Sequence, residues 1–266
     1  MGESFQLIQP LPALSAYVRH YWILETDKPY DIPERIIPFG NIQLSFYSGA
    51  PIIKDDEVWQ YQALLCGQTT GYADILPVGK IRIIAVVFQS IGAKAFFNLP
   101  MDEFAGLKIP VRDFADPGLK RLEELVVSTT DNRKCIIEIE RFLLKHLNPY
   151  QDHNYQRLQR VVGMINTHKG EISIHTLAEE AFLSHRQFRR IFSSHIGINP
   201  KDFIRTVRFQ YALSVLQNNP RIHFSQLAYD CGYYDQAHLI HEFKTFSGYT
   251  PGEYVSICDP YSDYFS

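Results

Sequence analysis

The chain has 266 residues and a formal net charge of −3, and 45% of its residues are hydrophobic. This length allows two domains with separate cores, and the composition is that of an ordinary globular protein, which argues against a disordered or fibrous chain. No apolar run approaches the roughly 18 residues that a membrane-spanning helix needs, so we expect no membrane partner.

Charge is distributed unevenly along the chain. Residues 1–154 carry 15 Lys and Arg against 19 Asp and Glu, whereas residues 155–255 carry 11 against 8, together with seven of the ten histidines. A mildly basic C-terminal half is compatible with a phosphate-binding surface. The four cysteines are far apart, and the first residues show no secretion signal, so we expect a cytoplasmic protein with reduced thiols.

Residues 1–113 are predicted to form a β-rich domain. Short runs of aromatic and β-branched residues, separated by Pro, Gly and Asp, predict strands at 17–25, 41–48, 61–67 and 81–89. The 41–48 run alternates apolar and polar residues, as a half-buried strand does, whereas the 81–89 run is apolar on both faces and should be central. Many short strands with frequent turns favour a cupin-like barrel or a sandwich, with a short helix over residues 92–100.

Two amphipathic helices are predicted at residues 117–127 and 132–147. We interpret residues 114–153 as a helical linker that can also mediate dimerisation, and residues 257–266 as a tail. The polar segment 148–154 is the expected domain boundary. The apolar stripe that we expect to dimerise consists of Ile136, Ile139, Leu143 and Leu147.

Residues 154–256 contain the same helix-turn-helix pattern twice. The first copy spans residues 172–203 and the second spans residues 221–254. The equivalent pairs are Leu177 and Leu227, Ala178 and Ala228, Phe188 and Leu239, Phe192 and Phe243, Gly197 and Gly248, and Pro200 and Pro251. One such unit is a weak signal, but two units joined by a long helix that starts at Pro200 are a strong one. The sequence therefore predicts an all-α C-terminal domain and an α+β protein overall.

The second helix of each unit is the expected DNA-reading helix. In the first unit, Ser184 and Gln187 predict a capping box, and three exposed arginines suit the major groove, where Arg bonds guanine or phosphate. In the second unit, Gln can read adenine, while Ala and Ile can pack on thymine methyl groups. The first unit should therefore dominate the affinity. The candidate DNA-binding residues are Ser184, Arg186, Gln187, Arg189, Arg190, Ser193, Gln236, Ala237, Ile240 and His241.

Residues 155–255 resemble the AraC/XylS family of transcription regulators. The matching segments are LAEEAFLS, FRRIF, GINPKDF, VRFQYA, LAYDCGYYDQ and EFKTFSGYTPGEY. The resemblance implies a seven-helix domain that places both reading helices in successive major grooves. Tyr234 stands where the family has a small polar capping residue, His241 where Arg is common, and His223 where the second unit's first helix has a polar cap. More weakly, the N-terminal half is similar to the sensor domains of such regulators.

The N-terminal half is expected to bind a small, partly apolar effector, because aromatic walls with a few polar groups are typical of small-ligand pockets. The candidate ligand-binding residues are Trp22, Arg35, Asn41, Gln43, Trp59, Gln68 and Gln89. The expected partners are double-stranded DNA, this effector, a second copy of the chain and, for an activator, RNA polymerase. In a bacterial cell such a protein is expected at the nucleoid.

Two alternatives compete with a ligand-controlled regulator. A cupin enzyme would need several histidines and a carboxylate for its metal, but residues 1–113 contain a single histidine, His20, and show no nucleophile with a base partner. His238 and His241 lack a third metal ligand at a familiar spacing. We therefore expect no catalytic residue, metal or cofactor. The other alternative is an architectural DNA-binding protein whose N-terminal half only dimerises.

Overall fold

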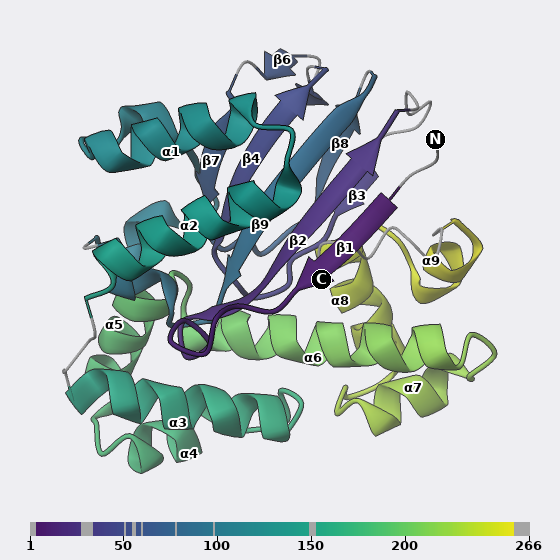
Figure 1. Cartoon of the computed structure of the whole chain (residues 1–266). Helices are drawn as coiled ribbons and strands as arrows, with labels where there is room; N and C mark the ends of the chain where they lie inside the picture. Colours follow the sequence, from purple (N-terminus) through teal and green to yellow (C-terminus); the bar gives the residue numbers. More distant parts are fainter. Residues whose placement is uncertain are drawn as a thin grey trace. The chain divides into compact units, whose positions relative to one another are not determined.

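The computed structural model of the chain describes residues 4–27, 34–50, 52–54, 57–59, 61–77, 79–97, 99–148 and 153–257. Its contacts group the chain into two compact units (Figure 1). The first unit comprises Met1–Glu34, Asn41–Gln68 and Asp74–Gln151, and the second comprises Arg35–Gly40, Thr69–Ala73 and Asp152–Ser266. The expected boundary at residues 148–154 lies where the first unit gives way to the second, and its residues 149–152 lie outside the described part.

The first unit is built on a six-stranded sheet in the order β1-β2-β9-β4-β7-β10, with antiparallel pairings. Its strands are β1 (Ser4–Ile8), β2 (Val18–Thr26), β4 (Gln43–Gly49), β7 (Ala63–Cys66), β9 (Ile81–Phe88) and β10 (Lys108–Pro110). A four-stranded sheet has the order β3-β8-β5-β6. Its strands are β3 (Glu34–Ile36), β5 (Ile52–Lys54), β6 (Glu57–Trp59) and β8 (Ala73–Pro77). The β-rich architecture is as predicted, and closure into a barrel stays a prediction.

Strand β9 is central, as its apolar sequence predicts, because β2 and β4 pair with its two edges. The neighbouring strand β4 differs from the prediction. Its apolar side chains Leu44 and Phe46 are buried, but Gln43 is also only 9% exposed and Ser45 is fully buried. The prediction of a half-buried strand is wrong, because both faces of β4 are covered.

Helices α1 (Pro117–Ser128) and α2 (Asn132–His146) lie against one face of the six-stranded sheet (Figure 1). Aspartates cap both N-termini: Asp116 accepts from the Gly118 and Leu119 amides, and Asp131 accepts from the Lys134 amide. Short 3-10 helices cover Ala93–Ala95, Met101–Phe104 and Val111–Asp113, so residues 92–100 form one turn rather than the expected helix.

The stripe that we expected to dimerise is packed inside the first unit. Ile139 and Leu143 are fully buried and Ile136 is 7% exposed, in one core cluster with the sheet. Amphipathic helices in folded domains mostly owe their stability to such packing. The expectation that this stripe pairs with a second copy is therefore corrected, and α1 and α2 belong to the core of the first unit rather than to a free linker.

The described part of the second unit contains seven helices, the number that the family resemblance implies. They are α3 (His153–Thr167), α4 (Ile174–Glu180), α5 (His185–Ile196), α6 (Pro200–Asn218), α7 (Phe224–Asp230), α8 (Gln236–Ser247) and α9 (Pro251–Ile257). Lys169 and Gly170, which follow α3, have positive φ of 55° and 76°. Within the described residues, each helix is too short or too polar to cross a membrane.

Helix α6 connects the two helix-turn-helix units. It begins at Pro200, as predicted, behind the N-cap Asn199, whose side chain accepts from the Asp202 amide. Its buried apolar side chains include Phe203 and Leu216 and also Phe209 and Leu213, the last two at 0% and 2% exposure. The helix is therefore covered on more than one side, which is how a connecting helix packs against both units.

Candidate nucleic-acid interface

The turns of the two helix-turn-helix units have the same backbone geometry. In each, the first turn residue donates its amide to the carbonyl three residues earlier, and the next residue donates to the carbonyl five residues earlier. These distances are 2.9 and 3.0 Å in the first unit and 3.2 and 2.9 Å in the second. The first turn residues, Phe182 and Gly232, are both left-handed, with φ of 54° and 67°. The duplication in the sequence is therefore a duplication in structure.

Each reading helix starts at a side-chain cap. Ser184 accepts from the Gln187 amide at 3.4 Å, and Gln187 accepts from the Ser184 amide at 3.3 Å, which forms the predicted capping box. In α8 the cap is Asp235, which accepts from the His238 amide at 2.7 Å. The second turn is one residue longer, so Tyr234 precedes the cap instead of occupying it. The expectation that Tyr234 stands at the capping position is wrong.

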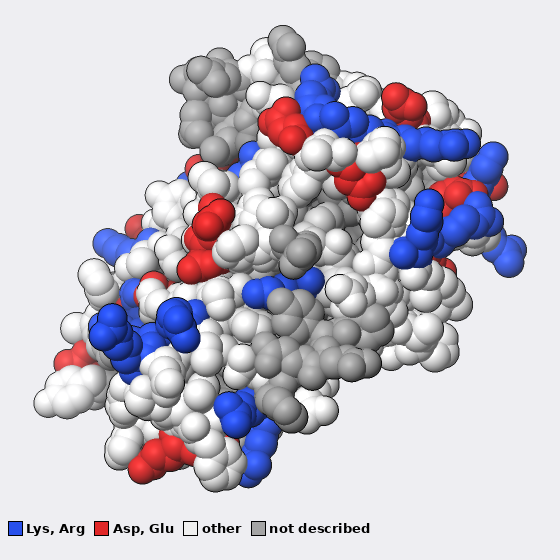
Figure 2. All heavy atoms as spheres, turned by 90° about the vertical axis from the view of Figure 1, so that its left-hand side faces the viewer, with Lys and Arg blue, Asp and Glu red and all other residues white. Residues whose placement is uncertain are grey.

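Helix α5 turns a cationic face to solvent. Its buried side chains Phe188 and Phe192 hold it in the core. The exposed candidates on its other face are Ser184, Arg186, Gln187, Arg189 and Arg190, and Ser193 is half-buried. Seen from the side on which α5 lies in Figure 1, the surface shows Lys and Arg side chains gathered in groups (Figure 2). Three guanidinium groups on one short helix can bond guanine bidentately or grip phosphates.

The capping box limits what two of these candidates can offer. The Oε1 atom of Gln187 accepts from the Ser184 hydroxyl at 3.0 Å as well as from its amide. The Gln187 Nε2 amide therefore remains for a base or a phosphate, since it is not part of the capping box. A role of these two residues in DNA contact stays a prediction.

The reading face of α8 carries fewer charges than that of α5, and its basic residue is Lys244, which is exposed and matched to Ser193. Gln236, Ala237 and His241 are exposed there, and Ile240 is half-buried. Tyr234, directly before the cap, is 93% exposed. This face can supply hydrogen bonds and apolar contacts to bases, but it brings no guanidinium group.

An open groove of about 550 Å³ runs beside the start of α5, lined by Ile174, His185, Arg186 and Arg189. At its edge His185 Nε2 lies 3.2 Å from His175 Nδ1, so the rings of α4 and α5 are hydrogen-bonded. No motif in the sequence connects these two histidines. Their ten-residue separation gave no signal, because only the fold of the turn brings them together.

Two of the ligand candidates share the sheet face opposite α1 and α2. Trp22 of β2 lies opposite Ala85 of β9, and Ala85 lies opposite Ser45 of β4. Gln43 is two residues before Ser45 in β4 and therefore points to the same side of the sheet. Trp22 is 1% exposed, and Gln43 donates to the Ser45 hydroxyl at 2.5 Å. The Oε1 atom of Gln43 is buried without a hydrogen-bond partner among the described residues. A buried, unpartnered acceptor is a costly feature that a ligand donor would satisfy.

The other candidates are placed in different ways. Asn41 donates to the Phe88 carbonyl at 2.5 Å, and Gln68 is 2% exposed. Gln89 is half-buried and donates to the Ser15 carbonyl at 3.3 Å. Trp59 lies in β6, and its side chain is outside the described residues.

His20, the histidine of the N-terminal half, has a lowered pKa of about 4, mainly because it is buried and also because of the nearby charge of Arg19.

Arg35 belongs to the second unit. Its guanidinium carbon lies 4.1 Å from the ring centre of Tyr72 and 4.2 Å from that of Tyr249. Its Nη1 donates to the Ser247 carbonyl in the last turn of α8 at 3.1 Å. Arg35 is thus assigned to a different compact unit from Trp22 and Gln43, and a shared ligand site of the three stays a prediction. A cation at the C-terminal end of a helix stabilises that end.

Among the residues that the structure describes, no group of three or more His, Cys, Asp or Glu side chains is placed to bind a metal. Cys135 and Cys231 are buried free thiols, and Cys66 is a half-buried one. Burial raises the pKa of all three thiols, which disfavours the reactive thiolate.

Comparisons with known proteins agree with this geometry. Residues 177–256 match the model of a helix-turn-helix domain, and residues 6–110 match a domain of unknown function, DUF6597. An uncharacterised HTH-type transcriptional regulator of Haemophilus influenzae is 31% identical over 94 residues, which are 35% of this chain and 31% of the relative. The probable transcriptional regulator LumQ of Photobacterium leiognathi is 26% identical over 151 residues, 56% of each chain.

The crystal structure of ToxT from Vibrio cholerae aligns with 96% of this chain and 98% of its own, at 11% identity and a TM-score of 0.46. The chain spans between a third and somewhat more than half of the curated relatives named here. The C-terminal part of the chain therefore contains two helix-turn-helix units, and the matched helix-turn-helix domain model agrees with the residue pattern and the fold.

Proposed function

We propose that this protein is a sequence-specific DNA-binding transcription regulator whose two reading helices enter successive major grooves. The observation that carries the proposal is the structural duplication of the helix-turn-helix unit, with three exposed arginines on the first reading helix. Helices α5 and α8 are each 12 residues long, enough to lie in a major groove and contact several bases.

Selection of bound duplexes from random-sequence DNA with the full chain tests this proposal. We expect two short recognised sites whose centres lie about one helical turn, ~10 bp, apart. Affinity should fall steeply with salt, because phosphate contacts release counterions. Binding that ignores base sequence at every salt concentration would contradict the proposal and favour an architectural protein.

We propose that the sheet face carrying Trp22 and Gln43 binds a small, partly apolar effector that alters DNA binding. Trp22 supplies an apolar wall, and the unpartnered Gln43 Oε1 supplies an acceptor for a ligand donor. A tenfold preference for one conformational state, ~1.4 kcal/mol, is enough to shift a regulator measurably. Metabolites that raise the melting temperature should do so less in Gln43→Leu and should change DNA affinity. An experimental structure with this face packed solid would contradict the effector.

The remaining roles are also proposals. Residues 1–113 act as the sensor and residues 154–256 as the DNA-binding domain, in a bacterial cell at the nucleoid, with RNA polymerase as a partner of an activator. For a homodimer, α2 offers Ile137 and Leu144, one heptad apart and 45% and 42% exposed. Sedimentation of Ile137→Glu/Leu144→Glu should show a loss of dimer, and a monomeric wild type would contradict dimerisation.

A further inference from the structure

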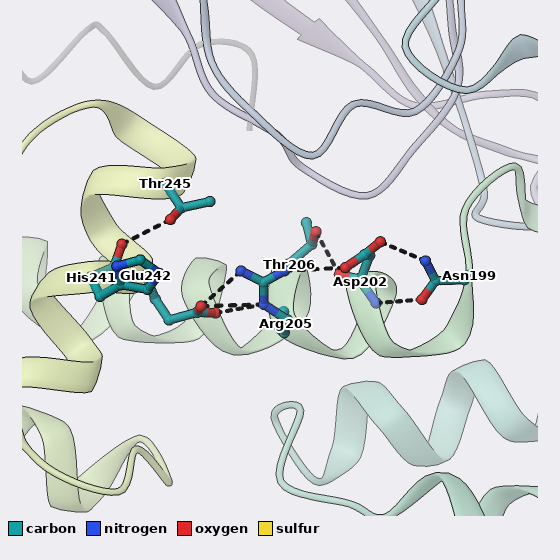
Figure 3. A network of polar contacts seen from close by, with 7 residues as sticks. All are labelled: Asn199, Asp202, Arg205, Thr206, His241, Glu242 and Thr245. Atoms are coloured by element: carbon teal, nitrogen blue, oxygen red, sulfur yellow. Dashed lines mark hydrogen bonds and ion pairs between the residues drawn. The ribbon is translucent and has the colours of Figure 1, made fainter.

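A partly buried ion pair ties the second reading helix to the connecting helix, with the Arg205 side chain 27% exposed and the Glu242 side chain 6% exposed. Arg205 of α6 contacts both carboxylate oxygens of Glu242 in α8: its Nε lies 3.0 and 3.2 Å from them, and its Nη2 lies 2.8 Å from Oε1 (Figure 3). Glu242 is 4% exposed. The guanidinium carbon also lies 5.2 Å from the ring centre of Phe246. A multiply bonded guanidinium–carboxylate pair has a fixed relative geometry, so it sets direction as well as distance.

The contacts continue from Arg205 toward the first helix-turn-helix unit, within the same compact unit of the chain. Arg205 Nη1 donates to Asp202 Oδ1 at 3.1 Å, and Asn199 Nδ2 donates to Asp202 Oδ2 at 2.6 Å. Asn199 is the N-cap of α6 and lies three residues after the end of α5 at Ile196 (Figure 3). Polar contacts therefore run without a break from the start of α6 to a buried side chain of α8.

The Arg205–Glu242 pair lies next to a residue of the DNA-reading face. It has no counterpart among the described residues of the first helix-turn-helix unit. Glu242 follows His241, which is on the exposed face of α8. The position equivalent to Glu242 in α5 is Ile191, a half-buried apolar residue. Helix α8 is otherwise held to α6 by ring contacts: Phe209 lies 5.1 Å from Phe243 and 5.0 Å from Phe246. These apolar contacts bury one face of α8, and the guanidinium–carboxylate pair adds hydrogen bonds of fixed direction between the two helices.

Stability alone is a poor reason for this pair. The Glu242 carboxylate is taken out of water, which costs much of the attraction to Arg205, and well-packed apolar residues of similar size are often equally stabilising at such a site. The half-buried Ile191 shows that this position of a reading helix accepts an apolar side chain.

We propose that Arg205 and Glu242 are positioning residues that fix the orientation of α8 on α6 and so determine which bases the second unit reads and at what distance from the first site. This inference rests on the proposed DNA-binding function. Neither residue is required to touch DNA: Glu242 acts through His241 and Gln236 on the exposed face of the same helix.

The test uses the full chain and duplexes selected from random DNA by the wild type. Each duplex is paired with a version mismatched in the first site, one mismatched in the second site, and one with 1 bp inserted between the sites. The variants are Arg205→Met/Glu242→Leu, which replaces the pair by apolar residues, and Glu242→Gln, which keeps the shape. The control is Glu180→Gln, which breaks the exposed Arg160–Glu180 pair between α3 and α4, with its 2.7 Å contact.

A second-site mismatch should lower wild-type affinity by roughly tenfold or more. In the double variant we expect the affinity penalty of a second-site mismatch, and that of the inserted base pair, to fall below about threefold. The affinity penalty of a first-site mismatch should stay as in the wild type. The penalties of the Glu242→Gln variant should lie between those of the wild type and the double variant, and the Glu180→Gln variant should match the wild type. Thermal melting shows whether each variant folds. If the melting temperature of the double variant is well below that of the wild type, the Glu242→Gln variant is the one that tests the proposal.

Unchanged second-site and spacing penalties in a folded variant would overturn the positioning role and leave the proposed function standing. An equal loss at both sites would also overturn it, because a general structural defect would explain that result. A wild type that tolerates every mismatch would instead refute the proposed function itself.

Discussion

The two helix-turn-helix units share the backbone hydrogen bonds at the start of their turns and a side-chain cap on each reading helix, but they differ in how they can engage DNA. The first reading helix presents Arg186, Arg189 and Arg190, whereas the matched residues in the second are Ala237, Ile240 and His241. The second helix instead has the partly buried Arg205–Glu242 pair behind it. The two copies thus share a backbone but differ in their side chains. The first has exposed arginines on its reading helix, and the second has an ion pair that holds its reading helix against α6.

This contrast separates two contributions to recognition. Cationic side chains on a reading helix supply salt-dependent affinity through phosphates, and they discriminate guanine when they reach a base. A face with few charges depends more on accurate placement, because hydrogen bonds and methyl contacts to bases act only over short distances. The fixed orientation of α8 is therefore most useful in the unit that has the fewest cations.

The largest effect is expected from a matched pair of substitutions, Arg190→Ala and His241→Ala, at equivalent positions of the two reading helices. Loss of a bidentate guanidinium contact should cost ~1–3 kcal/mol in binding, about 5- to 150-fold, and His241→Ala should cost less. Gel-shift titration at several salt concentrations measures both. If Arg190 contacts a phosphate, its removal should also lower the salt slope by about 1.

Arg189→Ala serves as a second probe of the cationic face and should rank with Arg190→Ala. Equal losses in all three variants, or the largest loss in His241→Ala, would contradict the unequal division between the units.

Local signals in the sequence predict much of this domain. The capping box at Ser184 and Pro200 at the start of α6 depend only on neighbouring residues, and both are confirmed. Asp235 was missed as a cap because one extra residue in the second turn shifts the register between the copies. Burial of Phe209 was missed because a single stripe cannot show that a helix is covered on more than one side.

Contacts between distant segments could not be predicted. Arg205 and Glu242 are 37 positions apart and on different helices, so no spacing rule connects them. The stripe on α2 was read correctly as an apolar face, but the sequence does not say what covers it. The sheet core does, through Ile139 and Leu143. Periodicity gives the face of a helix, whereas its partner is a property of the fold.

A smaller effect separates capping from charge at the second reading helix. Asp235→Ala should destabilise the protein by ~1 kcal/mol, as should Ser184→Ala, because each removes the acceptor for an amide in the first turn. Asp235→Asn keeps a capping oxygen but removes a negative charge from the expected DNA side of α8. It should leave stability nearly unchanged and raise DNA affinity, with a steeper salt dependence.

Denaturant titration and gel shift together measure these three variants. Reduced affinity in Asp235→Asn at unchanged stability would show that the Asp235 carboxylate itself contributes to DNA recognition, contrary to the assignment as a cap alone.

The smallest expected effect is a gain of stability at the first helix of the second unit. In the first unit Ser173 caps α4, and its hydroxyl accepts from the Thr176 amide at 3.0 Å. The equivalent residue His223 begins α7 without a side-chain cap bond, as the sequence predicts. His223→Ser should supply the missing acceptor and stabilise the protein by ~0.5–1 kcal/mol, and Ser173→His should cost a similar amount. Both residues are exposed, so neither change disturbs the core. Denaturant unfolding measures the pair; a His223→Ser variant no more stable than the wild type would show that α7 is held by its packing alone and that the two first helices differ in more than their caps.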